Sequence, residues 1–200
     1  MKKRIFFPVL LAALLLQGSF LVQSVEAKTI KKMVVKSINH EAKTLKALKD
    51  GDTYDVTATS AKIRKGSNSS RKTTFSKIKE GDVITVEGSF DDTDVTATKI
   101  RDLSYDDKKT VTFYGKIDSD SINDATKTFK IETLDRDKQT ISVLDSTKIK
   151  DKDGHNIVFS DLKEDDRVFV TGKWSRKNKT IAKTKTVDVL DEDDFEDLDN

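Results

Sequence analysis

Histidine and cysteine carry much of the nucleophilic and acid–base chemistry of enzymes, and this chain offers little of either. It has two histidines, His40 and His155, no cysteine, and neither a serine elbow nor an H-E-x-x-H pair. Its many carboxylates include no pair whose spacing marks a general acid and base. The lack of cysteine also excludes disulfides and thiolate metal sites. The sequence therefore predicts a protein that is not an enzyme and uses no cofactor.

Two acidic loops have the spacing that raises the question of a calcium site. They are DGDTYD at 50–55 and DKDGHN at 151–156. An EF-hand loop needs glycine at its sixth position and an acid at its twelfth. The twelfth residue is Ala61 in the first loop and Leu162 in the second. Asp-Gly is above all a hairpin-turn dipeptide, so we predict turns here and no metal site.

The strongest candidate for ligand binding is the stretch WSRKNK at 174–179. An aromatic ring followed by three cations has the composition needed to stack a base or sugar while neutralising phosphates. The candidate ligand-binding residues are therefore Trp174, Arg176, Lys177 and Lys179. The alternative is that Trp174, which shares a strand face with Val168 and Val170, fills the interior of a barrel.

This stretch lies at the end of a long internal repeat. TFSKIKEGDVITVEGSF at 74–90 corresponds to VFSDLKEDDRVFVTGKW at 158–174, an offset of 84 residues. Upstream, KTLKA at 43–47 corresponds to KTFKI at 127–131. A repeat of this length indicates a duplicated small domain. We predict a first module over 28–105 and a second over 108–190.

Alternation of apolar and polar residues predicts short strands throughout both modules. In the first module they are expected near 31–38, 44–48, 54–63, 82–90 and 94–103, and in the second near 111–117, 129–131, 141–143, 168–174 and 180–190. Ser76 and Ser160 are predicted N-caps of one helical turn after the third strand. Gly88 and Gly172 recur inside the fourth strand and predict a bulge or bend.

Five strands with a helical insert after the third follow the order of an OB-fold, and an SH3-like barrel is the alternative. The predicted fold class is all-β, with two tandem five-stranded OB-like barrels, each with one short helical turn between strands 3 and 4.

The motifs of the second module resemble those of a known family. V-x-F-x-G-K-I-D (111–118), K-T-F-K-I (127–131), S-T-K-I (146–149) and F-S-D-L-K-E-D-D-R-V-F-V-T-G (159–172) are similar to an exported bacterial family of domains of unknown function, the one numbered 5666. Two copies would cover nearly all of 30–190. The chain departs from the family pattern at Asp165, where glycine is usual, and at Lys36, which replaces an opening glycine. The resemblance implies an OB-like barrel and supplies no catalytic residues.

Residues 1–27 have the features of a signal peptide. Lys2, Lys3 and Arg4 precede an apolar run over 5–22, and Val25 and Ala27 occupy the small-residue positions of a cleavage site. We expect cleavage near Ala27 and a periplasmic or secreted protein without an integral membrane segment. The alternative is an uncleaved membrane anchor, because the run approaches the length that can span a bilayer.

Charge is unevenly distributed after this leader. The tail DEDDFEDLDN at 191–200 holds seven acids and no base, and residues 28–190 carry a formal net charge of +7. We expect a disordered, solubilising tail. The alternative is a tail that folds back and screens its own domain from polyanions.

The loop corresponding to 174–179 in the first module is FDDTD at 90–94, which is acidic. One hypothesis is that the acidic loop of one module faces the basic loop of the other, within one chain or between neighbours.

Three classes of function are consistent with these features. The leading expectation is an exported, non-enzymatic binding or adaptor protein whose partner is a protein or polymer of the bacterial cell envelope or extracellular space. The alternative is extracytoplasmic binding of nucleic acid or another polyanion through the second module. A secreted enzyme is the least supported class.

Overall fold

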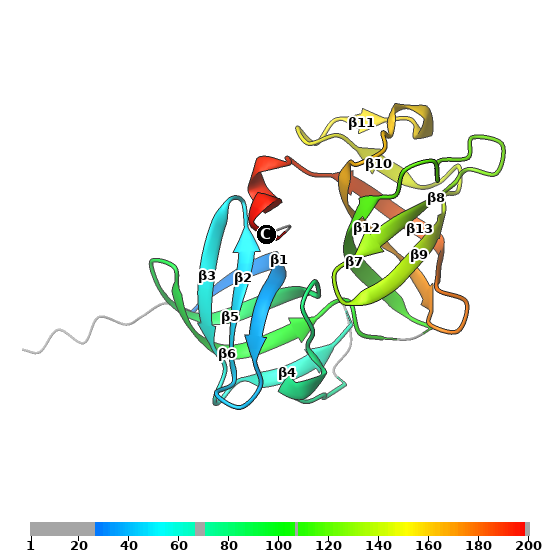
Figure 1. Ribbon diagram of the computed structural model, residues 1–200. Helices are drawn as coiled ribbons and strands as arrows, with labels where there is room; N and C mark the ends of the chain where they lie inside the picture. The colour runs from blue at the N-terminus through cyan, green and yellow to red at the C-terminus, as the bar shows by residue number, and fades with distance from the viewer. Residues whose placement is uncertain (1–26, 67–70, 107, 199–200) are drawn as a thin grey trace, which may run out of the picture.

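The computed structural model describes residues 27–66, 71–106 and 108–198 (Figure 1). The predicted signal peptide, apart from Ala27, lies outside the described residues. Within them the chain forms two β-sheets joined by a short linker. No helix in this part of the chain is long and apolar enough to cross a membrane.

The first sheet closes into a barrel. Its strands are β1 (Lys28–Asn39), β2 (Thr44–Lys49), β3 (Asp52–Thr57), β4 (Lys62–Lys65), β5 (Val83–Asp91) and β6 (Asp94–Asp102). Strands β1, β2 and β3 form an antiparallel meander, β3 pairs in parallel with β6, and β5 joins β6 back to β1. Strand β4 continues along β6, so the strand predicted at 54–63 is split in two by a break at 58–61.

The second sheet repeats this arrangement. Its strands are β7 (Thr110–Ile117), β8 (Thr128–Thr133), β9 (Arg136–Ser142), β10 (Lys148–Lys150), β11 (Asn156–Ile157), β12 (Arg167–Ser175) and β13 (Thr180–Val189). The closing pairs are β9 with β13 in parallel and β7 with β12 antiparallel. Single turns of 3₁₀ helix, η1 (Phe75–Lys77) and η2 (Phe159–Asp161), precede β5 and β12. The predicted all-β fold class is thereby confirmed, with a closed five-stranded barrel and two tandem domains.

The repeated segment after each 3₁₀ turn has a common structural role. The Asp82 carboxylate accepts a hydrogen bond from the Lys79 backbone N–H at 2.9 Å, and Asp166 accepts one from Lys163 at 2.8 Å. The predicted N-caps at Ser76 and Ser160 are wrong, because each turn begins two residues earlier than predicted, at a buried phenylalanine. The capping positions are Thr74 and Val158.

Both repeated glycines lie at irregularities of strand pairing, as predicted. The register shifts between Glu87 and Gly88 and again between Thr171 and Lys173. A Cβ atom on Gly88 would lie 2.9 Å from the Cα of Ala97, and one on Gly172 would lie 3.0 Å from the Cα of Thr184. Only glycine permits this close approach between strands.

The two barrels pack against each other through a shared apolar cluster, called the seam below. Its members are Val34, Leu48, Val83, Leu103, Tyr114, Phe169, Phe195 and Leu198. Strand β1 shows how the seam is built, because Met33 and Val35 face the first barrel's core whereas Val34, on the opposite face, joins the seam. Such strands bury both faces, which is why they contain consecutive apolar residues.

The acidic tail is folded as far as Leu198, and the prediction of a disordered tail is wrong for these residues. Residues Asp193–Leu198 form a 3₁₀ segment, η3, drawn in red between the two barrels in Figure 1. Phe195 is only 1% exposed, and its carbonyl accepts a hydrogen bond from Arg167. The apolar pair Phe195 and Leu198 anchors the segment in the seam, and the acids between them face outward.

Candidate functional site

A turn of the second module lies directly over the repeated segment of the first. This turn joins β8 to β9 and presents Leu134, Asp135 and Arg136. Arg136 forms an ion pair with Asp82, and Lys79 pairs with Asp135 at 2.7 Å. A Cβ on Gly81 would lie 2.8 Å from the Cβ of Leu134. The turn therefore fixes the position of one barrel against the other.

Two buried carboxylates lie at this junction. Asp82 and Asp102 are both 0% exposed. One oxygen of Asp102 accepts a hydrogen bond from the Ser104 backbone N–H at 2.9 Å, and the other has no partner. Burial, followed by the charge of Asp82, raises the pKa of Asp102 well above its ordinary value. Burial also raises the pKa of Asp82, although Arg136 opposes that shift. The junction thus favours the neutral form of Asp102.

A cleft of about 390 Å³ opens between the modules beside this junction. Its lining residues come from η1 and the segment after it, the linker, β9, the end of β12 and the β12–β13 turn: Ser76, Lys77, Lys79, Tyr105, Arg136, Asp137, Gln139, Trp174, Arg176 and Lys179. Five of these side chains are cationic and one is acidic. The cleft is therefore suited chemically to an anionic ligand.

Trp174 belongs to the barrel interior. It is 4% exposed, its ring meets Phe113 edge to face at 5.1 Å, and its Nε1–H donates to the Gln139 side chain at 3.0 Å. A ring buried to this degree does not fit the interpretation that it stacks on a base or sugar. The structure supports the alternative, in which Trp174 fills the barrel.

The three predicted cations have different positions. The Arg176 guanidinium lies 5.2 Å from the centre of the Trp174 ring and 5.5 Å from that of Tyr105. Lys179 pairs with Asp137 at 2.8 Å. Lys177 is exposed in the β12–β13 turn and does not line the cleft. The cleft brings together Trp174, Arg176 and Lys179 and adds Lys77, Lys79 and Tyr105, which sequence reasoning missed because they come from the other module and the linker.

Comparison with protein families accounts for both barrels. Residues 32–101 and 114–184 each match the model described as Domain of unknown function (DUF5666). The chain belongs to this family. No curated protein matches it. The first DUF5666 copy supplies Lys77 and Lys79 to the cleft, and the second supplies the residues from Arg136 to Lys179. The cleft is therefore a product of the tandem arrangement.

The hypothesis of pairing between the acidic and basic loops is wrong within one chain. In the second DUF5666 copy, Arg176 packs on Tyr105 and Trp174, and Lys179 pairs with Asp137. The β5–β6 turn of the first copy projects away from the second barrel (Figure 1). The version of the hypothesis between neighbouring molecules stays a prediction.

The loop 151–156 of the second DUF5666 copy forms the turn predicted for it. One Asp151 oxygen accepts backbone N–H groups from Asp153 at 3.0 Å and His155 at 2.8 Å. Potential ligand atoms of these three residues lie within 4.8 Å of one another. Because the Asp151 carboxylate already closes the turn, hydrogen bonding explains this arrangement.

Proposed function

We propose that the protein is an exported, non-enzymatic binding protein of the bacterial cell envelope or extracellular space, and that the cleft between its DUF5666 barrels binds a linear polyanion. The observation that carries this proposal is the lining of the cleft, with five cationic side chains and one acid. Export is supported by the signal-peptide pattern of residues 1–27.

The cations of the cleft differ in how freely they can meet a ligand. The Arg136 side chain is 13% exposed and forms an ion pair with the buried Asp82. Lys79 and Lys179 form exposed pairs with Asp135 and Asp137. Exposed pairs of this kind contribute less than about 1 kcal/mol, so an incoming anion can replace the aspartate. Lys77 and Arg176 also line the cleft, so its lining places four cations besides Arg136 within reach of a ligand.

A binding role also fits the position of the two histidines. His40 packs edge-on against Phe75 at 5.9 Å, and His155 lies in the 151–156 turn. Neither lines the cleft. The described cleft therefore offers charge and hydrogen bonds to a ligand and no imidazole for acid–base catalysis.

Binding is tested by titrating the mature protein with fluorescent single-stranded DNA, used as a linear polyanion, at 50 and 200 mM salt. Four phosphate contacts give a salt slope of about −2.8, so affinity should fall about 50-fold over this range. Lys77→Gln with Lys179→Gln should reduce both the affinity and the slope. Lys46→Gln with Lys62→Gln, at exposed positions of β2 and β4, is the control. Absence of binding by the native protein at 50 mM salt would refute the proposal.

Export is tested separately. N-terminal sequencing of protein recovered outside the cytoplasm should begin at Lys28. An intact Met1 on that material would contradict the predicted cleavage.

A further inference from the structure

A second basic surface lies on the outer side of the second barrel. It is a shallow groove of about 230 Å³, called the lysine groove below, lined by Lys108, Lys109, Thr110, Lys173, Lys183 and Lys185. Its lining contains no carboxylate. Among the described residues, none of the five ammonium groups lies within ion-pair distance of an acid.

Three neighbouring strands place these lysines together. Lys173 on β12 is opposite Thr110 on β7 and Ala182 on β13. Because side chains alternate along a strand, Lys173 faces outward and the next residue, Trp174, faces the core. The bulge opposite Gly172 adds Lys183, which has a left-handed backbone with φ of 51°. Residues other than glycine adopt such a conformation only rarely.

The duplication provides an internal comparison for these positions. Gly88 lies beside Ala97 as Gly172 lies beside Thr184, which aligns Thr98 with Lys185. Ser89 corresponds to Lys173 by the repeat offset. On this alignment Lys183 is an extra residue in the second module. The same barrel therefore forms with serine and threonine at these sites, and the fold does not require the lysines.

The first barrel also neutralises the charge on this part of its sheet. Glu87 and Lys99 are opposite one another on β5 and β6 and form an ion pair. Their counterparts in the second barrel, Thr171 and Thr186, are opposite one another but uncharged. Only the second barrel therefore concentrates positive charge here. Like charges closer than about 8 Å repel in physiological salt, and an anion relieves that repulsion.

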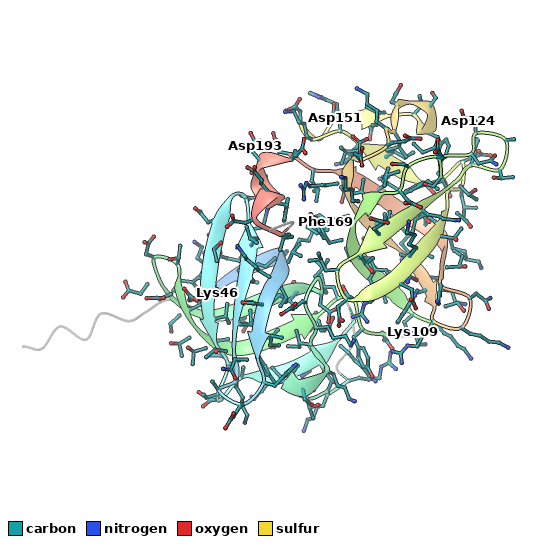
Figure 2. The ribbon with its side chains drawn as sticks, in the orientation of Figure 1. Lys46, Lys109, Asp124, Asp151, Phe169 and Asp193 are labelled. Carbon is teal, nitrogen blue, oxygen red and sulfur yellow. The ribbon has the colours of Figure 1, made fainter. Side chains whose placement is uncertain are left out.

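Two backbone hydrogen bonds connect the lysine groove to Trp174, a residue of the cleft. The Lys108 N–H donates to the Trp174 carbonyl at 2.8 Å, and the Trp174 N–H donates to the Lys109 carbonyl at 3.1 Å. Trp174 also lines the cleft, so Lys108 and Lys109 of the groove are hydrogen-bonded to a residue of the cleft. The acidic tail is held elsewhere by pairs such as Lys36 with Asp197. Figure 2 shows Asp193 of the tail in the upper part of the view and Lys109 well apart from it, at the lower right.

We infer that the lysine groove is a second binding site for the linear polyanion that occupies the cleft, and that a single strand passes from one to the other across β12. The inference rests on the proposed function. Lysine presents a point charge without the fixed fork of arginine. The groove therefore recognises charge density along a polymer and does not distinguish phosphate from carboxylate.

The test compares labelled oligodeoxythymidylates of about 4 and about 20 nucleotides, lengths that span the site sizes of OB-folds. The groove variant combines Lys109→Gln, Lys173→Ser and Lys185→Thr, the last two taken from the first module. For the long strand its salt slope should fall by about 2, at about 0.7 for each lost contact. For the short strand, which occupies the cleft alone, affinity should stay unchanged. Thermal melting confirms that the variant is folded.

The outcomes separate this inference from the proposed function. A groove variant that binds the long strand with native affinity and salt slope would overturn the inference. In that case, a loss of binding in the Lys77→Gln/Lys179→Gln variant would still support the proposal that the cleft binds the polyanion. Failure of the native protein to bind either strand at 50 mM salt would refute the proposed function itself. Poly-L-glutamate should compete with the long strand, and a complete lack of competition would overturn recognition by charge density.

Discussion

The ion pair between Arg136 and Asp82 makes a strong prediction about stability. Asp82 is 0% exposed and the Arg136 side chain is 13% exposed, so Arg136→Gln leaves a buried carboxylate without its cation. Removal of one partner of a buried pair costs about 3 to 5 kcal/mol. The guanidinium also lies 5.4 Å from the centre of the Phe113 ring and 5.7 Å from that of Trp174. Each of these cation–π contacts adds about 0.5 to 2 kcal/mol. We expect a loss of at least about 3 kcal/mol in the free energy of unfolding.

Urea titration at pH 7 measures this loss, with the fluorescence of the single tryptophan as the signal. The exposed pair of Lys46 with Asp55 provides the control, and Lys46→Gln should cost less than about 1 kcal/mol. The double variant Asp82→Asn/Arg136→Gln should recover much of the stability, because no buried charge is left alone.

The pH dependence of this variant follows from the same geometry. Burial raises the pKa of Asp82, and without Arg136 the pKa should rise further. Protonation removes the unpaired charge, so the penalty should be smaller at pH 5 than at pH 8. A loss equal to that of Lys46→Gln, or no recovery in the double variant, would refute this account of the junction.

Three further predictions concern the same junction and the tail. Because the pKa of Asp102 is raised in the folded state, its contribution to stability is present below about pH 3.9 and is lost as the pH rises through the folded-state pKa. Asp102→Asn should therefore raise the free energy of unfolding at pH 8 and flatten its dependence on pH, as measured by urea titration. Gly81→Asp should destabilise by about 1 to 3 kcal/mol because the new side chain meets Leu134, whereas the reciprocal Asp165→Gly should change the melting temperature little; equal effects would contradict the packing argument. Phe195→Ala should cost about 3 to 5 kcal/mol in the seam, and an unchanged unfolding midpoint would show that the tail contributes nothing there.

The sequence was sufficient to predict each barrel but not the way the barrels combine. Alternation of apolar residues and the repeated glycines reflect local strand structure, so the strands and bulges could be predicted. The seam had a weaker signal, the consecutive apolar residues of 33–35 and 168–170, whose two faces serve different clusters. The burial of Phe195 could not be predicted, because its acidic neighbours dominate the composition of the tail.

The candidate site could be predicted only in part, because it forms where the two barrels pack together. Arg176 and Lys179 could be found from the charge of one loop. Lys77 and Tyr105 could not, because their relation to that loop exists only after the modules have packed. The burial of Trp174 follows from the strand face that it shares with Val168 and Val170, whereas its hydrogen bond to Gln139 is not visible in that pattern.

The contact between the turn 133–136 and the segment 79–82 also limits how far the duplication can extend. The equivalent turn of the first module, 49–52, has Asp50 and Asp52 in place of Leu134 and Arg136. The equivalent segment of the second module has Asp165 in place of Gly81. The turn 49–52 and the segment that contains Asp165 therefore lack the residues that would repeat this contact with another molecule. We therefore expect that this heterologous interface does not propagate from molecule to molecule into a filament.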